Sequence, residues 1–175
     1  ETASHYARLM VDLELVGVRF EVMGNTPVIV LRERTGDRRV LPIYIGTPEA
    51  QSILWAVEGR VPERPLTHDL LVNVLGALGA VLERVLITEV SDGVFLAEMM
   101  LQTRSGPVSV PCRPSDGVAV AVRVGCPIAC EPNVIDEAGR FADLGSEGDD
   151  EGDETALLGE FRDFIENINP DDFKP

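Results

Sequence analysis

The chain contains two histidines, and only His68 lies within its body, because His5 stands among the polar first residues. His68 occurs in RPLTHDLLVNVLGALG, residues 64–79, between Thr67 and Asp69 at the start of an apolar helical pattern. Imidazole is the side chain best suited to proton transfer near neutral pH, and a helix N-terminus attracts phosphate. Helix capping is the alternative, with Thr67 as the N-cap and Asp69 in the first turn. The sequence alone favours capping.

Two acidic residues and one arginine could complete a site around His68. Glu49 and Asp116 each follow a predicted strand, at the start of a predicted helix. Carboxylates grouped with a histidine are what a divalent ion and a phosphodiester need. Arg113 could bind a phosphate through two hydrogen bonds, or it could pair with Asp116. The alternative for both acids is the ordinary preference of carboxylates for helix N-termini.

Two runs of strand-like sequence each predict an antiparallel meander of three strands. The first run changes parity at Val16-Gly17, which predicts a β-bulge. Asp92, followed by a glycine between two strands, is predicted to be a turn residue. The predicted strands cover residues 11–23, 28–34, 39–46, 81–90, 94–103 and 107–112, with a shorter one within 126–132.

A helical pattern follows each meander, and capping residues mark where the helices begin: Thr47, Thr67, and Ser115 with Asp116. The predicted helices cover residues 47–59, 67–79, 115–125 and 133–141. In the second helix the apolar residues fall at three- and four-residue spacing, so we expect one face to pack against a core. These residues are Leu70, Leu71, Val74, Leu75 and Leu78.

The two halves of the chain share one order of features. Each has a meander, then a proline, an acidic residue and small residues, and then a helix that ends at glycine. We therefore expect one structural unit used twice within an α+β domain. Chance similarity between two short matches is the alternative.

The net charge of −15 is unevenly distributed. Residues 1–130 carry 15 acidic and 12 basic residues, whereas residues 131–175 carry 15 acidic and 3 basic residues. A nucleic-acid-binding protein usually presents a basic surface, because Lys and Arg displace counterions from phosphates. Any nucleic-acid binding is therefore expected to be weak and non-specific. A modest arginine cluster, with a solvated hairpin as its alternative reading, comprises Arg32, Arg34, Arg38 and Arg39.

The end of the chain differs in character from the rest. Residues 143–154, DLGSEGDDEGDE, are highly charged and almost free of apolar residues, so we expect a disordered acidic linker. Residues 155–175 predict an acidic amphipathic tail helix, which would dock on its own domain or on a protein partner. Its apolar stripe comprises Leu157, Phe161, Phe164, Ile165 and Ile168. Residues 1–10 are expected to be an N-terminal extension.

No apolar run approaches the roughly 20 residues that a membrane span needs, and the first residues lack a signal-peptide pattern. Three cysteines are an odd number, which is typical of reduced thiols rather than of a disulfide framework. Cys126 and Cys130 have loosely metal-like spacing, but no further Cys or His lies nearby, so we expect buried thiols rather than zinc. We expect a cytoplasmic protein with no membrane contact.

Common catalytic patterns are missing from the sequence. It contains no phosphate-binding loop, no dinucleotide fingerprint, no paired-histidine zinc helix and no Gly-x-Ser-x-Gly. Aromatic residues make up only 5% of the chain, which argues against extensive base stacking.

Four stretches together resemble the bifunctional nuclease (BFN) domain family of bacteria and plants: LPIYIGTPEAQSI, EGRVPERPLTHDLL, LITEVSDGVFLAEM and RPSDGVAVAVRVGCPI. The resemblance covers about residues 11–139, so we expect a BFN-like domain over 11–142. The ending NINPDDFKP looks like that of actinobacterial members. The resemblance implies a duplicated β-α-β-β unit whose antiparallel strands curl into a barrel-like core with helices packed on it. It also implies hydrolysis of DNA and RNA with little sequence specificity.

The positions that match the family's motifs are Glu49, Thr67, His68, Asp69, Arg113, Ser115 and Asp116. Gly117 departs from the family pattern, in which alanine is expected, and this should affect packing more than chemistry. We infer that His68 acts as general base or acid, while the three acids orient it or hold a divalent ion such as Mg²⁺ or Mn²⁺. Glu49 and Asp116 are the candidate metal ligands. Arg113, Ser115 and Thr67 are the candidate substrate-binding residues.

A function of a different class fits the same residues. A non-enzymatic regulatory module would bind a small anion or a protein partner in the same cleft, and the nearly neutral body favours it. In either case we expect a homo-oligomer, because both central helices present apolar faces.

Overall fold

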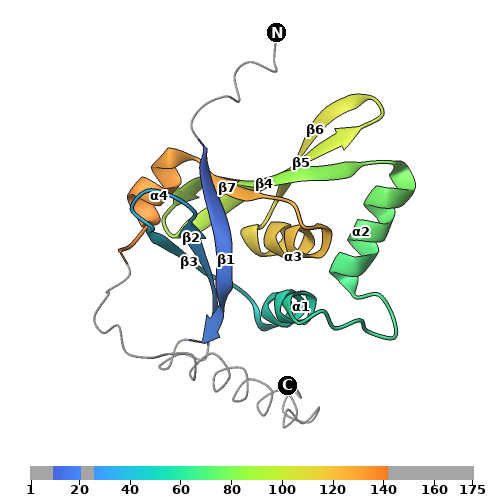
Figure 1. Cartoon of the computed structure of the whole chain (residues 1–175), viewed down its shortest axis with the longest axis horizontal. Coiled ribbons are helices and arrows are strands. Elements are labelled where there is room, and N and C mark those ends of the chain that lie inside the picture. Colours follow the sequence, from blue (N-terminus) through green and yellow to red (C-terminus); the bar gives the residue numbers. More distant parts are fainter. Residues whose placement is uncertain (1–9, 21–25, 142–175) are drawn as a thin grey trace. The chain divides into compact units, whose positions relative to one another are not determined.

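The computed structural model describes residues 10–20 and 26–141, which form seven strands and four helices (Figure 1). The strands are β1 (Val11–Phe20), β2 (Pro27–Glu33), β3 (Val40–Tyr44), β4 (Val81–Ser91), β5 (Val94–Thr103), β6 (Gly106–Cys112) and β7 (Ile128–Cys130). The helices are α1 (Thr47–Val57), α2 (Thr67–Leu78), α3 (Pro114–Val124) and α4 (Pro132–Ala138). The predicted meanders and helices are confirmed within a few residues.

All seven strands belong to one sheet, in the order β3-β2-β1-β7-β4-β5-β6. The two meanders lie on either side of β7, which pairs antiparallel with β1 and parallel with β4. The register of β1 against β2 shifts between Leu15 and Gly17, which confirms the predicted bulge. Asp92 and Gly93 have φ of 51° and 78° in the turn between β4 and β5, as a two-residue hairpin turn requires.

The sheet is open, so the barrel-like core that the resemblance implied is not confirmed. β3 and β6 are its edges and do not pair with each other. Each edge contains proline, Pro42 in β3 and Pro107 and Pro111 in β6, and proline cannot donate a hydrogen bond to a neighbouring strand. The repeated unit also differs from the expected β-α-β-β, because each half runs β-β-β-α, from β1 to α1 and from β4 to α3.

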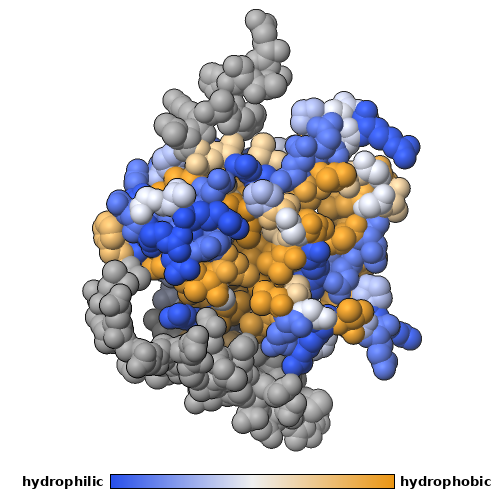
Figure 2. Space-filling model, in the orientation of Figure 1, coloured by the Kyte–Doolittle hydropathy of each residue, from blue (hydrophilic) through white to orange (hydrophobic). Residues whose placement is uncertain are grey.

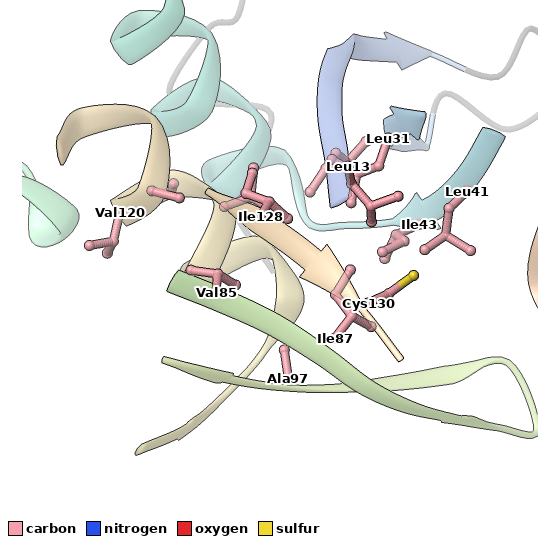
Figure 3. Packing of buried hydrophobic residues seen from close by; sticks show 14 of the residues in the cluster. Leu13, Leu31, Leu41, Ile43, Val85, Ile87, Ala97, Val120, Ile128 and Cys130 are labelled. Atoms are coloured by element: carbon pink, nitrogen blue, oxygen red, sulfur yellow. The ribbon is translucent and has the colours of Figure 1, made fainter. Parts of the chain in front are cut away.

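The core lies between the twisted sheet and the helices. In Figure 1, α3 lies between α1 and the strands β4 and β5, and α2 stands against α3 at the side of the molecule. Figure 3 shows buried side chains from both meanders, from β7 and from α3 pointing into a common interior. The labelled ones are Leu13, Leu31, Leu41, Ile43, Val85, Ile87, Ala97, Val120, Ile128 and Cys130.

Helix α3 approaches β4 closely because Gly117 has no side chain, and the residues that follow it are small and buried. Gly117, Val118, Ala119, Val120 and Ala121 are all buried. A Cβ atom added at Gly117 would lie 2.7 Å from Cγ1 of Val85 and 3.3 Å from Sγ of Cys112. The departure of this chain from the alanine expected at position 117 therefore has a packing role, because it lets the start of α3 lie against the sheet.

Helix α2 is the least covered helix, and none of its residues is buried. Leu71 and Leu75 pack partly against the core, whereas Leu70 and Leu78 are 56% and 71% exposed and Val74 is 43% exposed. The prediction that all five apolar residues face the core was therefore wrong for these three. The opposite side of α2 packs against α3, so the stripe of Leu70, Val74 and Leu78 is exposed to solvent. Figure 2 shows further apolar surface in the middle of one face, bordered by hydrophilic residues.

The arginine cluster of the β2–β3 hairpin is largely paired with acidic residues of β1 and β2. Arg32 and Arg38 both bind Glu14, at 2.8 and 2.9 Å. Arg39 binds the buried Glu33 at 2.9 Å, and its hydrogen bonds hold the pKa of Glu33 below its usual range. This pairing favours the reading of the cluster as part of the hairpin structure.

None of the helices in the described segments is long and apolar enough to cross a membrane. Cys112, Cys126 and Cys130 are free thiols, and burial raises the pKa of Cys130 to about 12. The predicted linker at 143–154 and tail helix at 155–175 lie outside the described residues, as does most of the N-terminal extension.

Replacing Gly117 tests the close approach of α3 to β4. Gly117→Ala should lower the free energy of unfolding by about 1–2 kcal/mol, because the overpacking penalty exceeds the gain in helix propensity. Gly76→Ala is the matched control, because Gly76 also lies within a helix and its added Cβ would meet nothing within 4 Å. The control should be neutral or stabilising in urea denaturation. A Gly117→Ala protein as stable as the control would contradict this packing.

Candidate active site

The first turns of three helices meet at one place in the fold. Glu49 lies in the first turn of α1, His68 in that of α2, and Asp116 in that of α3. Arg113 is the N-cap residue of α3. Because α3 packs against both α1 and α2, groups 67 residues apart along the chain come together. Three helix N-termini also make this end of the molecule favourable for negative charge.

His68 is held at both ring nitrogens. Its Nε2 lies 3.1 Å from Oδ1 of Asp116, and its Nδ1 lies 2.8 Å from Oγ of Ser52. The imidazole is only 12% exposed. The structure therefore brings together His68 and Asp116, as the sequence predicted, and adds Ser52, which the sequence analysis did not identify.

Arg113 joins Glu49 to Asp116 on the exposed side of the site. Its Nε donates to Oδ2 of Asp116 at 2.7 Å, and its Nη2 donates to Asp116 Oδ1 and to Glu49 Oε1, each at 2.8 Å. The guanidinium side chain is 64% exposed, whereas those of Glu49 and Asp116 are 16% and 24% exposed. Arg113 is thus the group of this site that solvent reaches most easily.

A second arginine lies on the inner side of His68. Arg123 donates from Nε to Oδ1 of Asp69 at 2.6 Å, from Nη2 to Oγ of Ser52 at 3.0 Å, and from Nη1 to the backbone oxygen of Ala119 at 2.8 Å. Its side chain is 9% exposed. Asp69 also accepts the backbone N–H of Leu66 at 2.8 Å, so it fixes both the start of α2 and Arg123.

These contacts form one continuous network. It runs from Glu49 through Arg113, Asp116, His68, Ser52 and Arg123 to Asp69. We call it the helix-start network. Its acids and bases come from all three helices, so the network depends on the packing of α1 and α2 on α3.

Hydrogen bonds and charge lower the pKa of two carboxyl groups in the network, Asp116 and Asp69. Burial alone would raise the pKa of Asp116, but hydrogen bonds from Arg113 and His68 and the charge of Arg113 lower it below its usual range. Burial likewise opposes ionisation of Asp69, and Arg123 together with the Leu66 N–H lowers its pKa below the usual range. Hydrogen bonds to Asp116 and Glu49 raise the pKa of Arg113, which therefore keeps its charge.

Both predicted substrate-binding hydroxyls, those of Thr67 and Ser115, lie outside the network. Thr67 is exposed at the start of α2, and Ser115 is buried in α3 with 5% exposure. The predicted side-chain caps were wrong: the N-cap residues of α1, α2 and α3 are Gly46, Leu66 and Arg113, with no capping hydrogen bond from their side chains. Helix α2 instead uses the Asp69 carboxylate to cap the Leu66 N–H.

Ser52 and Arg123 are the network members that the sequence analysis missed. The available signals are weak: a serine within the apolar stretch of EAQSILWAVE, and a single arginine in VAVAVRVG. A buried arginine needs partners, but sequence spacing does not show which ones it has. Only the packing of α1 against α3 brings the two together.

Within residues 10–20 and 26–141, no group of three or more His, Cys, Asp or Glu side chains is arranged to hold a metal ion. The two candidate ligands, Glu49 and Asp116, are bridged by Arg113. In this arrangement the positive charge between the carboxylates is that of the guanidinium.

Comparison with known proteins identifies the family to which this chain belongs. The bifunctional nuclease domain matches residues 29–143. An uncharacterized protein found in two strains of Mycobacterium tuberculosis is 40% identical over 168 residues, which cover 94% of this chain and 99% of the relative. The matched segment contains every residue of the helix-start network, and the chain belongs to the bifunctional nuclease domain family.

Proposed function

We propose that this protein hydrolyses phosphodiester bonds of DNA and RNA with little sequence preference. The observation that supports the proposal best is the contact between His68 and Asp116 beside the exposed guanidinium of Arg113. Membership of the bifunctional nuclease domain family supports a nuclease-like role.

Arg113 is the proposed phosphate-binding group. Among the described residues its Nη1 donates to no protein atom, while its other nitrogens are held by Asp116 and Glu49. A phosphate oxygen at Nη1 would receive a charge-assisted hydrogen bond. Contacts to phosphate carry no base information, which fits weak sequence preference. Of the two candidate hydroxyls, Thr67 is exposed and next to His68 in the chain, whereas Ser115 is buried away from solvent.

His68 and Asp116 are the proposed proton-transfer pair. Water attacks phosphorus, the pair takes the proton that the water loses, and the pair returns a proton to the leaving oxygen. The pair therefore holds the same number of protons before and after each turnover. Glu49 and Asp69 act as orienting groups, through Arg113 and Arg123 respectively. A divalent ion such as Mg²⁺ or Mn²⁺ would have to displace Arg113 to reach both Glu49 and Asp116.

The second candidate function is a non-enzymatic module that binds a small anion or a protein partner. The specific observation in its favour is that the protein itself engages both nitrogens of His68 and most donors of Arg113. A network whose hydrogen-bonding groups are already satisfied by the protein can bind an anion without catalysing a reaction. Tight binding of a mononucleotide with no turnover of any nucleic acid would decide for this module.

Removing the proton-transfer pair tests the nuclease proposal. His68→Ala and Asp116→Ala should each lower the rate of cleavage of single-stranded DNA and RNA by about 10²–10⁴-fold, the range expected for loss of a general acid or base. The assay measures kcat/KM with Mg²⁺, with Mn²⁺ and with a chelator. Asp92→Asn is the control, because this turn aspartate is outside the network and asparagine also tolerates its φ of 51°. Cleavage by both alanine variants at the wild-type rate would contradict the proposal.

We also propose that the protein is a homo-oligomer that associates through the exposed stripe of α2. Leu70, Val74 and Leu78 lie one helical turn apart and are exposed. A symmetric contact would bury the same stripe on both copies. The cytoplasmic location and the docking of the tail helix at 155–175 stay predictions.

Charge on the α2 stripe tests this association. The double change Leu70→Asp with Leu78→Asp should convert the oligomer to monomer in light scattering coupled to size exclusion, because two buried aspartates would lack partners. Val61→Asp is the control, since Val61 is 92% exposed in the connector before α2. A wild-type protein that runs as a monomer, or a double variant that keeps the wild-type mass, would contradict the proposal.

A further inference from the structure

Ser52 and Arg123 lie behind His68, on the side away from Arg113, and the proposed proton transfer does not use them. Ser52 is 5% exposed and the Arg123 side chain is 9% exposed. Buried polar groups persist in proteins when their hydrogen bonds are satisfied, so the direction of each bond here can be worked out.

The outer nitrogen of His68 must carry a proton. Both oxygens of Asp116 accept hydrogen bonds from the Arg113 guanidinium, an arrangement that matches an ionised carboxylate, and an ionised carboxylate only accepts hydrogen bonds. Oδ1 of Asp116 lies 3.1 Å from Nε2, so the hydrogen between them belongs to Nε2. A neutral imidazole has one N–H, which leaves Nδ1 with a lone pair.

The inner nitrogen then needs a donor, and Ser52 supplies it. Oγ of Ser52 lies 2.8 Å from Nδ1 and 3.0 Å from Nη2 of Arg123. A guanidinium only donates, so Arg123 fills one acceptor position of the hydroxyl, and the hydroxyl hydrogen points to Nδ1. The bonds therefore run in one direction, from Arg123 to Ser52, His68 and Asp116.

We propose that Ser52 and Arg123 are positioning residues that hold His68 in the tautomer with its proton on Nε2. Arg123 can do this because it is itself fixed by Asp69 and by the backbone oxygen of Ala119.

The tautomer of His68 decides whether His68 or Asp116 accepts the proton from the attacking water. This part of the inference rests on the proposed function. The lone pair of His68 is covered by Ser52, so the Asp116 carboxylate is the group that accepts the proton of the attacking water. When Arg113 turns to the phosphate bound at its Nη1, it releases a hydrogen bond to Asp116 and frees a carboxylate oxygen to accept that proton. His68 keeps Asp116 in place through its Nε2–H, and Asp116 then returns the proton to the leaving oxygen.

The test is nitrogen NMR of the imidazole in the full chain, with His5→Gln as background so that His68 is the only histidine. The wild-type ring should show its proton on Nε2 and a hydrogen-bonded Nδ1. In Ser52→Ala and in Arg123→Met the Nδ1 signal should move toward that of a nitrogen without a donor, and the preference for the Nε2–H tautomer should fall. Arg123→Lys keeps a cationic donor and should stay closer to wild type.

Kinetics complete the test. Both Ser52→Ala and Arg123→Met should lower kcat by roughly 10–100-fold, as loss of a supporting hydrogen bond does at metal-bound histidines, with KM within about threefold of wild type. A wild-type proton on Nδ1 overturns the inference even if Ser52→Ala fails to fold. Unchanged nitrogen signals, or an unchanged kcat in an active protein, also overturn it. If neither the wild-type protein nor any variant cleaves nucleic acid, the proposed function fails. The inference about Ser52 and Arg123 is then decided by NMR alone, from the wild-type tautomer and its response to Arg123→Met.

Discussion

The carboxylate of Asp116 is the interaction on which the rest of the site depends. Its two oxygens accept from Arg113 on the open side and from His68 on the closed side. Both contacts require the first turn of α3 to lie where α1 and α2 begin. That placement in turn requires α3 to approach β4, which Gly117 permits by leaving room for Val85. A packing constraint in the core thus sets the geometry of the surface chemistry.

The network combines two arginines of different character. Arg113 is exposed and pairs with Glu49 and Asp116, and in the proposed mechanism it exchanges a protein carboxylate for a substrate phosphate. Arg123 is nearly buried and holds Asp69 and Ser52, so it acts as part of the structure. Between them His68 is fixed on both sides. The network therefore has an exposed arginine on one side of His68 and a nearly buried arginine on the other.

Local patterns in the sequence predicted most elements, because strand alternation, turn residues and glycine stops are properties of neighbouring residues. The bulge before Gly17 and the turn at Asp92 were found in this way. The open sheet was missed because it depends on β7, three residues long, pairing between distant strands. Convergence of His68 with Asp116 was predicted from residue type and family resemblance, whereas Ser52 and Arg123 gave little local signal because their roles arise from packing.

The most direct measurement of the central claim is a double-mutant cycle on cleavage of single-stranded RNA, using His68→Ala, Asp116→Ala and the variant with both changes. If the two side chains act as one unit, the double variant should be about as slow as the slower single variant, since either change already disables the pair. Rate losses that multiply would show that the residues act independently and would contradict the account.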